Sequence, residues 1–119
     1  MRNLRQAAQK WIEDWNRRDL EAILEHYAED VAVCSPRVVE RFGVADGWIH
    51  GKHRLREYFA IGLRQPSLRF DLIEVLAGVN AMTVVYRREN GVLAADCSEL
   101  GPDGRIGRMI ACYGVLPLR

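Results

Sequence analysis

The chain has 119 residues and a mass of 13.6 kDa, which is the usual size of one folded domain. Apolar residues make up 49% of it and charged residues 28%, a balance that excludes a disordered chain. Seventeen basic residues against sixteen acidic ones leave a formal charge of +1, too weak a field to attract nucleic acid or an anionic membrane. We therefore expect no nucleic acid and no membrane as partner, and the near-neutral charge favours an uncharged, hydrophobic small molecule.

The cysteines and the N-terminal residues bear on compartment and cofactors. The first residues, MRNLRQAAQKW, lack the apolar run of a signal peptide, and no stretch matches a membrane helix, so a cytoplasmic location is predicted. Cys34, Cys97 and Cys112 show no CxxC spacing, which argues against disulfides and zinc, and we expect each to be a small buried residue in a strand. The histidines also lack metal-ligand spacing, so no metal and no other cofactor is expected.

Helical periodicity dominates the first half of the chain. Apolar residues recur at spacings of three and four, and Asp19 is a suitable N-cap for the second such stretch. The predicted helices are 3–16, 20–28 and 52–64. Between the second and third helices, the pattern predicts a short strand, an irregular loop and a short extended piece, at 31–35, 36–47 and 48–49.

The second half of the chain is typical of an antiparallel meander. Apolar and polar residues alternate, and the turn between the middle strands is Asn90-Gly91, the strongest hairpin signal in the chain. The predicted strands are 68–77, 81–89, 92–100 and 105–115. The sequence therefore predicts a single α+β domain over 1–119, with three N-terminal helices on a curved, mainly antiparallel sheet. Such a cone encloses a pocket on the concave face of the sheet, which is a natural site for a small ligand.

Four strings carry a family resemblance. They open or close the predicted elements, and they read WNRRDLEAI at 15–23, YAEDV at 27–31, IHGK at 49–52 and DGRI at 103–106. With the order of elements, they make the chain resemble the NTF2-like superfamily, in its SnoaL-like and ketosteroid isomerase-like branches. The resemblance covers about residues 5–114 and implies the cone-shaped NTF2-like fold. Because this fold hosts isomerases, dehydratases, cyclases, epoxide hydrolases and non-enzymes, it implies no single activity.

The ketosteroid isomerase pattern is only partly present. By the resemblance, the position of that enzyme's carboxylate base falls on Ser35, and its tyrosine position falls on Trp11. That enzyme also has a protonated aspartic acid, whose raised pKa is one of its known features. The position of this aspartic acid falls on Asp96. A serine without an attendant base does not abstract a carbon-bound proton at a useful rate, so steroid isomerisation by this mechanism is not expected.

Asp96 is the candidate catalytic acid or base. Strand alternation places it on one face with Ala94 and Ser98, and the family register points that face into the pocket. Desolvation there raises the pKa of a carboxyl group toward neutrality. A structural alternative stays open, in which Asp96 pairs with a buried arginine or accepts a hydrogen bond from a Tyr or Trp. A second carboxylate, as in the epoxide hydrolase branch, is not evident, since the face of Asp71 is ambiguous.

Aromatic and soft side chains are expected to line the pocket. Their mixture of apolar surface and a few polar tips suits an aromatic, polyketide-like or terpenoid ligand. With Ser35 and Arg88 added for their positions, the predicted lining residues are Trp11, Trp15, Ser35, Trp48, Tyr58, Tyr86, Arg88, Met109 and Tyr113.

Three hypotheses for function follow. The first is an isomerase, cyclase or lyase that acts on a small apolar carbonyl compound through Asp96. The second is a non-catalytic domain that binds the same kind of ligand. The third is a dimerisation domain, and a homodimer through the sheet is expected under all three. The outer face of the sheet, opposite the pocket, is defined by its apolar residues Val85, Leu93, Ala95, Cys97, Ile110 and Cys112.

Overall fold

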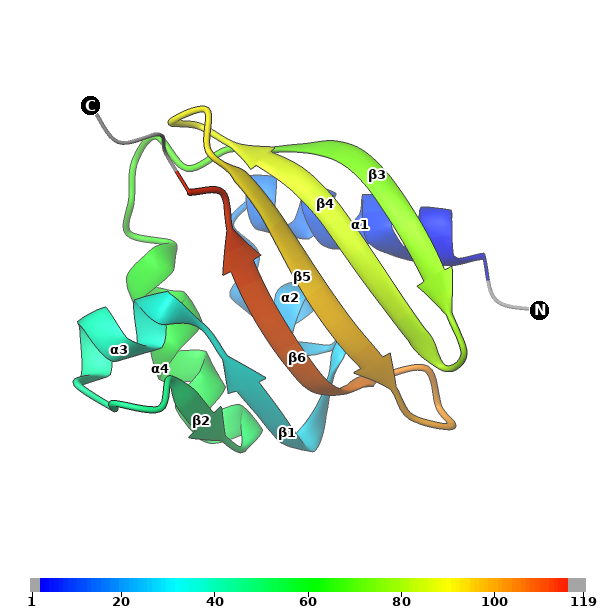
Figure 1. The fold of residues 1–119 in the computed structure, drawn as a ribbon, viewed down its shortest axis with the longest axis horizontal. Helices are drawn as coiled ribbons and strands as arrows, with labels where there is room; N and C mark the ends of the chain where they lie inside the picture. Colours follow the sequence, from blue (N-terminus) through cyan, green and yellow to red (C-terminus); the bar gives the residue numbers. More distant parts are fainter. Residues whose placement is uncertain (1–2, 116–119) are drawn as a thin grey trace.

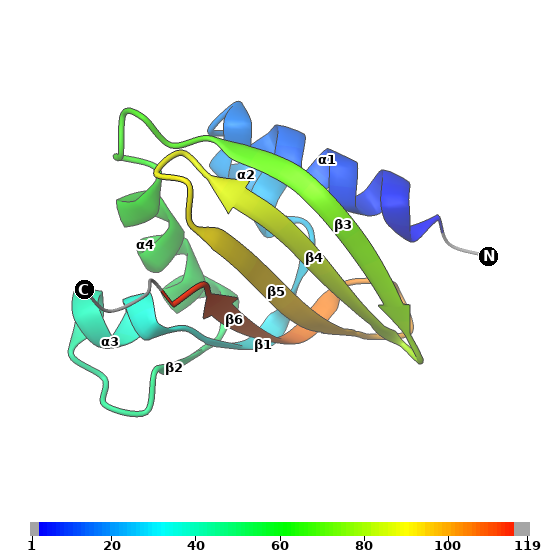
Figure 2. The same ribbon diagram turned by 45° about the horizontal axis from the view of Figure 1, so that its top comes forward.

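Helices cover the concave side of one curved six-stranded sheet, and the other side of the strands is left open (Figures 1 and 2). The computed structural model describes residues 3–115. In chain order the elements are α1 (Leu4–Asn16), α2 (Leu20–Leu24), β1 (Tyr27–Cys34), α3 (Pro36–Phe42), β2 (Trp48–His50), α4 (Lys52–Gly62), β3 (Phe70–Gly78), β4 (Ala81–Arg88), β5 (Leu93–Leu100) and β6 (Ile106–Tyr113).

The sheet has the strand order β2-β1-β6-β5-β4-β3. Strands β3 to β6 form the predicted antiparallel meander, and β1 joins it by pairing in parallel with β6. The short strand β2 then pairs antiparallel with β1 at the edge. The α+β class and the curved, mainly antiparallel sheet are therefore confirmed.

Helix α1 forms because it carries an apolar stripe and a proper N-cap. The side chain of Asn3 accepts a hydrogen bond from the backbone of Gln6, and the buried stripe includes Trp11 and Trp15. At its other end, the Asn16 amide exchanges two hydrogen bonds with the backbone of Phe70, at 2.9 and 2.8 Å. These bonds tie the end of α1 to the start of β3, so both tryptophans face the concave side of the sheet.

The second helix is shorter than the prediction, which extended it to Ala28. Helix α2 ends at Leu24, and β1 begins at Tyr27. Tyr27 has no exposed surface, it pairs with Ile106 of β6, and its hydroxyl accepts a hydrogen bond from the Trp11 indole. This long-range burial draws the residue into the sheet and overrides its local helical pattern.

A fourth helix, α3, lies where an irregular loop was predicted over 36–47. The side-chain oxygen of Ser35 caps it by accepting from the backbone of Arg37, and Pro36 occupies the first turn. Gly43, in the left-handed conformation at φ 67°, ends it. The prediction of three helices is wrong by this one element, and Figure 1 shows α3 beyond the end of β1, next to α4.

The outer face of the sheet carries two cysteines that were expected to be buried. Cys97 and Cys112 are exposed there, because alternation along β5 and β6 turns them away from the core, and Cys34, at the end of β1, is half-buried. Within residues 3–115 no group of His, Cys, Asp or Glu side chains is arranged to hold a metal ion. None of the described helices combines the length and the apolarity that crossing a bilayer requires.

Candidate functional site

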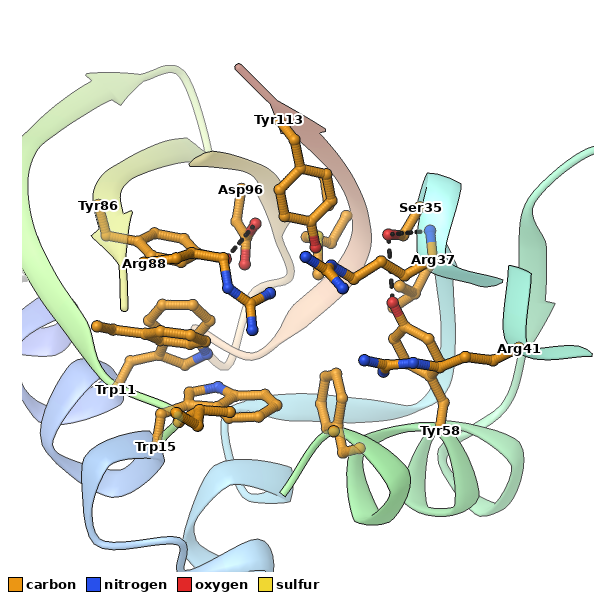
Figure 3. Close-up of a pocket in the computed structure, with 17 residues that line it drawn as sticks. Trp11, Trp15, Ser35, Arg37, Arg41, Tyr58, Tyr86, Arg88, Asp96 and Tyr113 are labelled. Atoms are coloured by element: carbon orange, nitrogen blue, oxygen red, sulfur yellow. Dashed lines mark hydrogen bonds between the residues drawn. The ribbon is translucent and has the colours of Figure 1, made fainter. Parts of the chain in front are cut away.

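A cavity opens between the concave face of the sheet and helices α1, α3 and α4 (Figure 3). Its empty volume is about 480 Å³, with the open mouth included. Its walls are formed by Trp11, Trp15, Val33, Ser35, Arg37, Arg41, Tyr58, Phe59, Gly62, Leu68, Phe70, Tyr86, Arg88, Asp96, Met109, Ala111 and Tyr113.

The structure brings the predicted site residues together at this cavity, with one exception. Trp11, Trp15, Ser35, Tyr58, Tyr86, Arg88, Asp96, Met109 and Tyr113 all line it. Trp48 does not. It pairs with Cys34 at the sheet edge, and the guanidinium of the exposed Arg108 lies 4.8 Å from its ring centre, so Trp48 belongs to the outer side of the sheet. The error arose because an isolated three-residue edge strand shows no alternation that would reveal its inward face.

Asp96 lies in the middle of β5 with its carboxyl group buried in the cavity wall. The residue is 5% exposed, and its Oδ1 accepts a hydrogen bond from the Tyr86 hydroxyl at 3.3 Å. Burial raises the pKa of Asp96 to about 7, although the Tyr86 hydrogen bond and the nearby positive charge of Arg88 both work to lower it. A carboxyl group with this pKa exchanges a proton readily near neutral pH.

Stacked aromatic rings form the apolar end of the cavity. The ring centre of Phe70 lies 4.5 Å from that of Tyr86, 5.3 Å from that of Trp15 and 6.0 Å from that of Trp11. Phe59 packs edge-on against Trp15 at 4.8 Å. These contacts hold the rings in fixed orientations, so the wall offers a rigid apolar surface to a ligand.

Two polar positions suggested by the ketosteroid isomerase pattern are already engaged in the fold. The Trp11 indole N–H donates to the Tyr27 hydroxyl at 3.0 Å, so it does not point a free donor at a ligand. Ser35 caps α3 and also accepts from the Tyr58 hydroxyl at 3.2 Å. Asp71 lies on the solvent side of β3, with 60% of its side chain exposed. Asp96 is therefore the only carboxyl group among the described residues that line the cavity.

Three arginines also line the cavity, and sequence reasoning identified only Arg88 of them. Arg37 and Arg41 come from α3, and the guanidinium groups of all three point toward the middle of the cavity (Figure 3). Each lies about 5 Å from the centre of an aromatic ring, at 5.2 Å for Arg88 over Phe70. The signal that could have found α3 is Ser35-Pro36, a capping residue before a proline, with Gly43 after the last turn.

Within the described residues, three buried side-chain N–H groups have no hydrogen-bond partner. They are the indole N–H of Trp15 and the Nε–H groups of Arg37 and Arg88, and all three residues line this cavity. Buried donors are rarely left unpaired, and here they are gathered in one place. The arrangement is suited to a ligand that brings hydrogen-bond acceptors.

Asp96 also belongs to the wall of a second, smaller cavity. This second cavity is lined by residues that include Tyr27, Ser98 and His26, and it shares Trp11 and Asp96 with the first. Burial and the nearby Asp96 raise the pKa of Tyr27, so its hydroxyl keeps its proton. Asp96 and Trp11 are therefore shared by the walls of both cavities.

Comparisons with known proteins agree with this architecture. The model of the SnoaL-like domain family matches residues 8–111. A SnoaL-like protein of unknown function from Burkholderia thailandensis E264 is 38% identical, with a TM-score of 0.89 over 93% of each chain. No curated protein matches the chain.

More distant solved structures share the fold alone. A candidate isomerase of the SnoaL-like family from Agrobacterium tumefaciens C58 is 18% identical, with a TM-score of 0.70 over 91% of this chain and 94% of its own. TerC, co-crystallised with polyporic acid, is 19% identical, with a TM-score of 0.73 over 92% and 89%. The match of the family model over most of the length, together with the 38% identical relative, shows that the chain belongs to the SnoaL-like family of the NTF2-like superfamily.

Proposed function

We propose that the protein catalyses proton transfer on a small, mainly apolar carbonyl compound, with Asp96 as the acid and base. The observation that carries the proposal is that the Asp96 carboxyl group is buried in the cavity wall and has a pKa of about 7. Such a group is ionised often enough to accept a proton and is protonated often enough to return it. The fold relatives include a candidate isomerase and a protein co-crystallised with an organic acid, which supports a ligand of this general kind.

The chemistry needs only one carboxyl group. The Asp96 carboxylate removes a proton from the carbon next to the ligand carbonyl, and the C–H electron pair moves toward the carbonyl oxygen, which becomes an enolate. Asp96 then returns the proton to another carbon, which isomerises the compound, or to a departing group, which cleaves it. Closure of a ring by attack of the enolate carbon on a second carbonyl starts from the same intermediate. The class of reaction therefore covers isomerase, lyase and cyclase.

Two donors support the proposal, in which they stabilise the enolate oxygen. The Nε–H of Arg88 and the indole N–H of Trp15 are buried, line the cavity and have no partner among the described residues. Arg88 is 8% exposed, so its charge acts in a region from which water is largely removed. Fixed donors of this kind lower the energy of a developing oxyanion more than mobile water does.

The experiment is deuterium exchange in a panel of cyclic ketones and 1,3-dicarbonyl compounds dissolved in D2O. The protein is expected to accelerate the loss of the α-proton NMR signal for at least one compound, and Asp96→Asn is expected to abolish the acceleration. Asp71→Asn is the matched control, because Asp71 lies outside the cavity on the neighbouring part of the sheet. Exchange that Asp96→Asn leaves unchanged would refute the catalytic role.

A binding domain without turnover is the second candidate. It is favoured by Ser35, which occupies the base position of the resemblance and is engaged in capping α3. In that case the same compounds bind, Asp96→Asn leaves their affinity unchanged, and none of them exchanges protons. Measured affinity and measured exchange on the same panel therefore separate the two functions.

We further propose that two copies of the chain pair through the outer face of the sheet. None of the described helices crosses this face, and Leu93, at 40% exposed, lies on it with the half-buried Val85, Ala95 and Ile110. Light scattering is expected to give twice the chain mass, and Ala95→Glu is expected to give the monomer mass. Val79→Glu, at an exposed turn away from this face, is the control. A monomeric wild-type protein would contradict the proposal.

A further inference from the structure

The cavity holds more positive charge than the proposed proton transfer needs. Arg88 lies beside Asp96 and serves the developing enolate, but Arg37 and Arg41 project into the same space from α3. Asp96 is the one carboxyl group in the described wall, and its pKa leaves it partly protonated near neutral pH. Arg88 Nη2 also lies 3.7 Å from Oε2 of Glu89, so Arg37 and Arg41 are the two arginines whose charges the described wall leaves unmatched.

Within residues 3–115, the arginines of α3 differ from most of the other arginines because no described carboxylate pairs with them. Among residues 3–115, the arginines in ion pairs are Arg5, Arg17, Arg54, Arg56, Arg69, Arg88, Arg105 and Arg108. Arg37 and Arg41 are absent from these pairs, although both are half-buried. The Nε–H of Arg37 is a buried donor without any described partner. A partly buried guanidinium without an anion is unfavourable unless a ligand supplies one.

The surroundings hold both side chains in place in spite of this cost. The Arg37 guanidinium lies 5.0 Å from the ring centre of Tyr113, and that of Arg41 lies 5.1 Å from the ring centre of Tyr58. Gly62 leaves the space that Arg41 uses, since a Cβ at that position would lie 3.3 Å from Arg41 Nη1. Both arginines are thus oriented before any ligand arrives, as a recognition site requires.

We propose that the ligand is an organic carboxylate, whose anionic group binds between Arg37 and Arg41 while its apolar body lies against the aromatic wall. The inference rests on the proposed function only in assuming the same cavity, and it replaces the uncharged ligand expected from the chain's net charge. A planar guanidinium offers paired N–H donors that match the two oxygens of a carboxylate. The Nε–H of Arg37 gains the acceptor that it lacks, and the reacting carbon of the ligand is held toward Asp96.

The test compares two probes of nearly the same shape, trans-cinnamate and trans-cinnamamide, by calorimetric titration at about pH 6. Cinnamate is expected to bind roughly tenfold or more tightly than the neutral amide. The double variant Arg37→Gln/Arg41→Gln is expected to remove this preference and to leave the affinity for cinnamamide unchanged. Arg87→Gln is the matched control, because Arg87 lies on the exposed side of β4.

Three results would overturn the inference. They are equal binding of the two probes, a preference for cinnamate that survives in the double variant, and no binding of either probe at millimolar concentration. The comparison on the unaltered protein does not depend on any variant folding, and Gly62→Ala is a milder second variant that should weaken cinnamate alone by displacing Arg41.

The outcome is separable from that of the proton-transfer proposal. If cinnamate is preferred through Arg37 and Arg41 but no compound exchanges protons, the carboxylate site stands and the catalytic role of Asp96 falls. If exchange requires Asp96 but no charge preference is found, the catalytic role stands and the carboxylate site falls. Titration of cinnamate into Asp96→Asn checks that binding of the anion does not itself require Asp96.

Discussion

The phenol oxygen of Tyr86 lies 3.3 Å from Oδ1 of Asp96 and donates its hydrogen to that carboxyl oxygen. The two residues project from neighbouring strands, since Asp96 pairs with Val84 and Tyr86 pairs with Ala94. The hydrogen bond favours the carboxylate form, whereas burial favours the neutral acid. The pKa of about 7 is the balance of these opposing effects.

Replacement of Tyr86 by Phe tests that balance. The hydrogen bond lowers the pKa of Asp96, so its loss should raise that pKa by roughly one unit. The midpoint of the pH dependence of proton exchange should move up by the same amount, and so should the midpoint of a carboxyl-carbon NMR titration of Asp96. The Tyr58 hydroxyl donates to Ser35 and not to Asp96, so Tyr58→Phe should leave both midpoints in place. A midpoint that falls in Tyr86→Phe would refute this account.

Asp96 should make the stability of the protein depend on pH. Its pKa is raised from about 3.9 in the unfolded chain to about 7 in the folded one, so the folded state holds a proton that the unfolded state loses in between. The free energy of unfolding should therefore fall as pH rises from about 4 to 7, by at most about 4 kcal/mol.

The variant Asp96→Asn isolates this effect, because the asparagine side chain does not ionise and still accepts from Tyr86. Relative to the wild type, it should gain stability between about pH 4.5 and pH 8 in urea unfolding. Asp71→Asn should show no such trend, since Asp71 is exposed. An equal difference between Asp96→Asn and wild type at both pH values would contradict the buried, neutral carboxyl group.

Asp14 should have the opposite pH dependence. Its side chain has no exposed surface, and it lies 2.5 Å from Lys10 Nζ, 2.6 Å from Arg17 Nη2 and 2.9 Å from His26 Nε2. Burial works to raise the pKa of Asp14, but hydrogen bonds from Lys10 and His26 outweigh it and hold that pKa below its ordinary value. The stabilisation is therefore present above about pH 4 and is lost as pH falls through the lowered pKa.

Asp14→Asn should cost about 1–3 kcal/mol of unfolding free energy at pH 7. The cost should shrink at acidic pH, where the wild-type carboxylate is protonated. Urea unfolding at several pH values measures it, with Asp71→Asn as the exposed control. A cost that does not change with pH would show that Asp14 acts through packing alone.

Ser35→Ala should destabilise α3 and weaken the proposed carboxylate site together. The change removes the N-cap, and it leaves the hydroxyl of the buried Tyr58 without its acceptor, for a total of about 2 kcal/mol. Fraying of the first turn displaces Arg37, so the affinity for cinnamate should fall as well. Ser35→Thr should restore both, and Ser67→Ala, at an exposed position, should change neither.

Much of the site follows from two local periodicities in the sequence, the spacing of residues on a helix face and the alternation of residues along a strand. The four-residue spacing of Trp11 and Trp15 places both on one helix face, and alternation places Tyr86 and Arg88 on one strand face. Alternation also placed Asp96 on one face with Ala94 and Ser98, but its inward direction was predicted from the family resemblance, and the structure buries the residue in the cavity wall. Apart from the inward direction of Asp96, these inferences need only the period of an element and the side on which its apolar residues lie.

Other features depend on contacts between distant parts of the chain. Burial of Tyr27 against β6 ends α2 early, and pairing of β2 with β1 turns Trp48 outward. The capping residue marks helix α3 in the sequence, but no local pattern shows that its arginines line the cavity. The residues that these arginines contact, Tyr113 and Tyr58, belong to β6 and α4.

The charge of the chain shows most clearly the difference between what the sequence determines and what the tertiary structure decides. A net charge of +1 correctly describes the whole chain, and it led to the expectation of an uncharged ligand. The local patterns of residues were sufficient for the α+β class and for the face on which Asp96 lies, because helix and strand periods act over a few residues. Only the folded chain brings three arginines and one carboxyl group into the wall of the same cavity, since a net charge has no position and the electrostatics of a site depend on which charges lie close to one another.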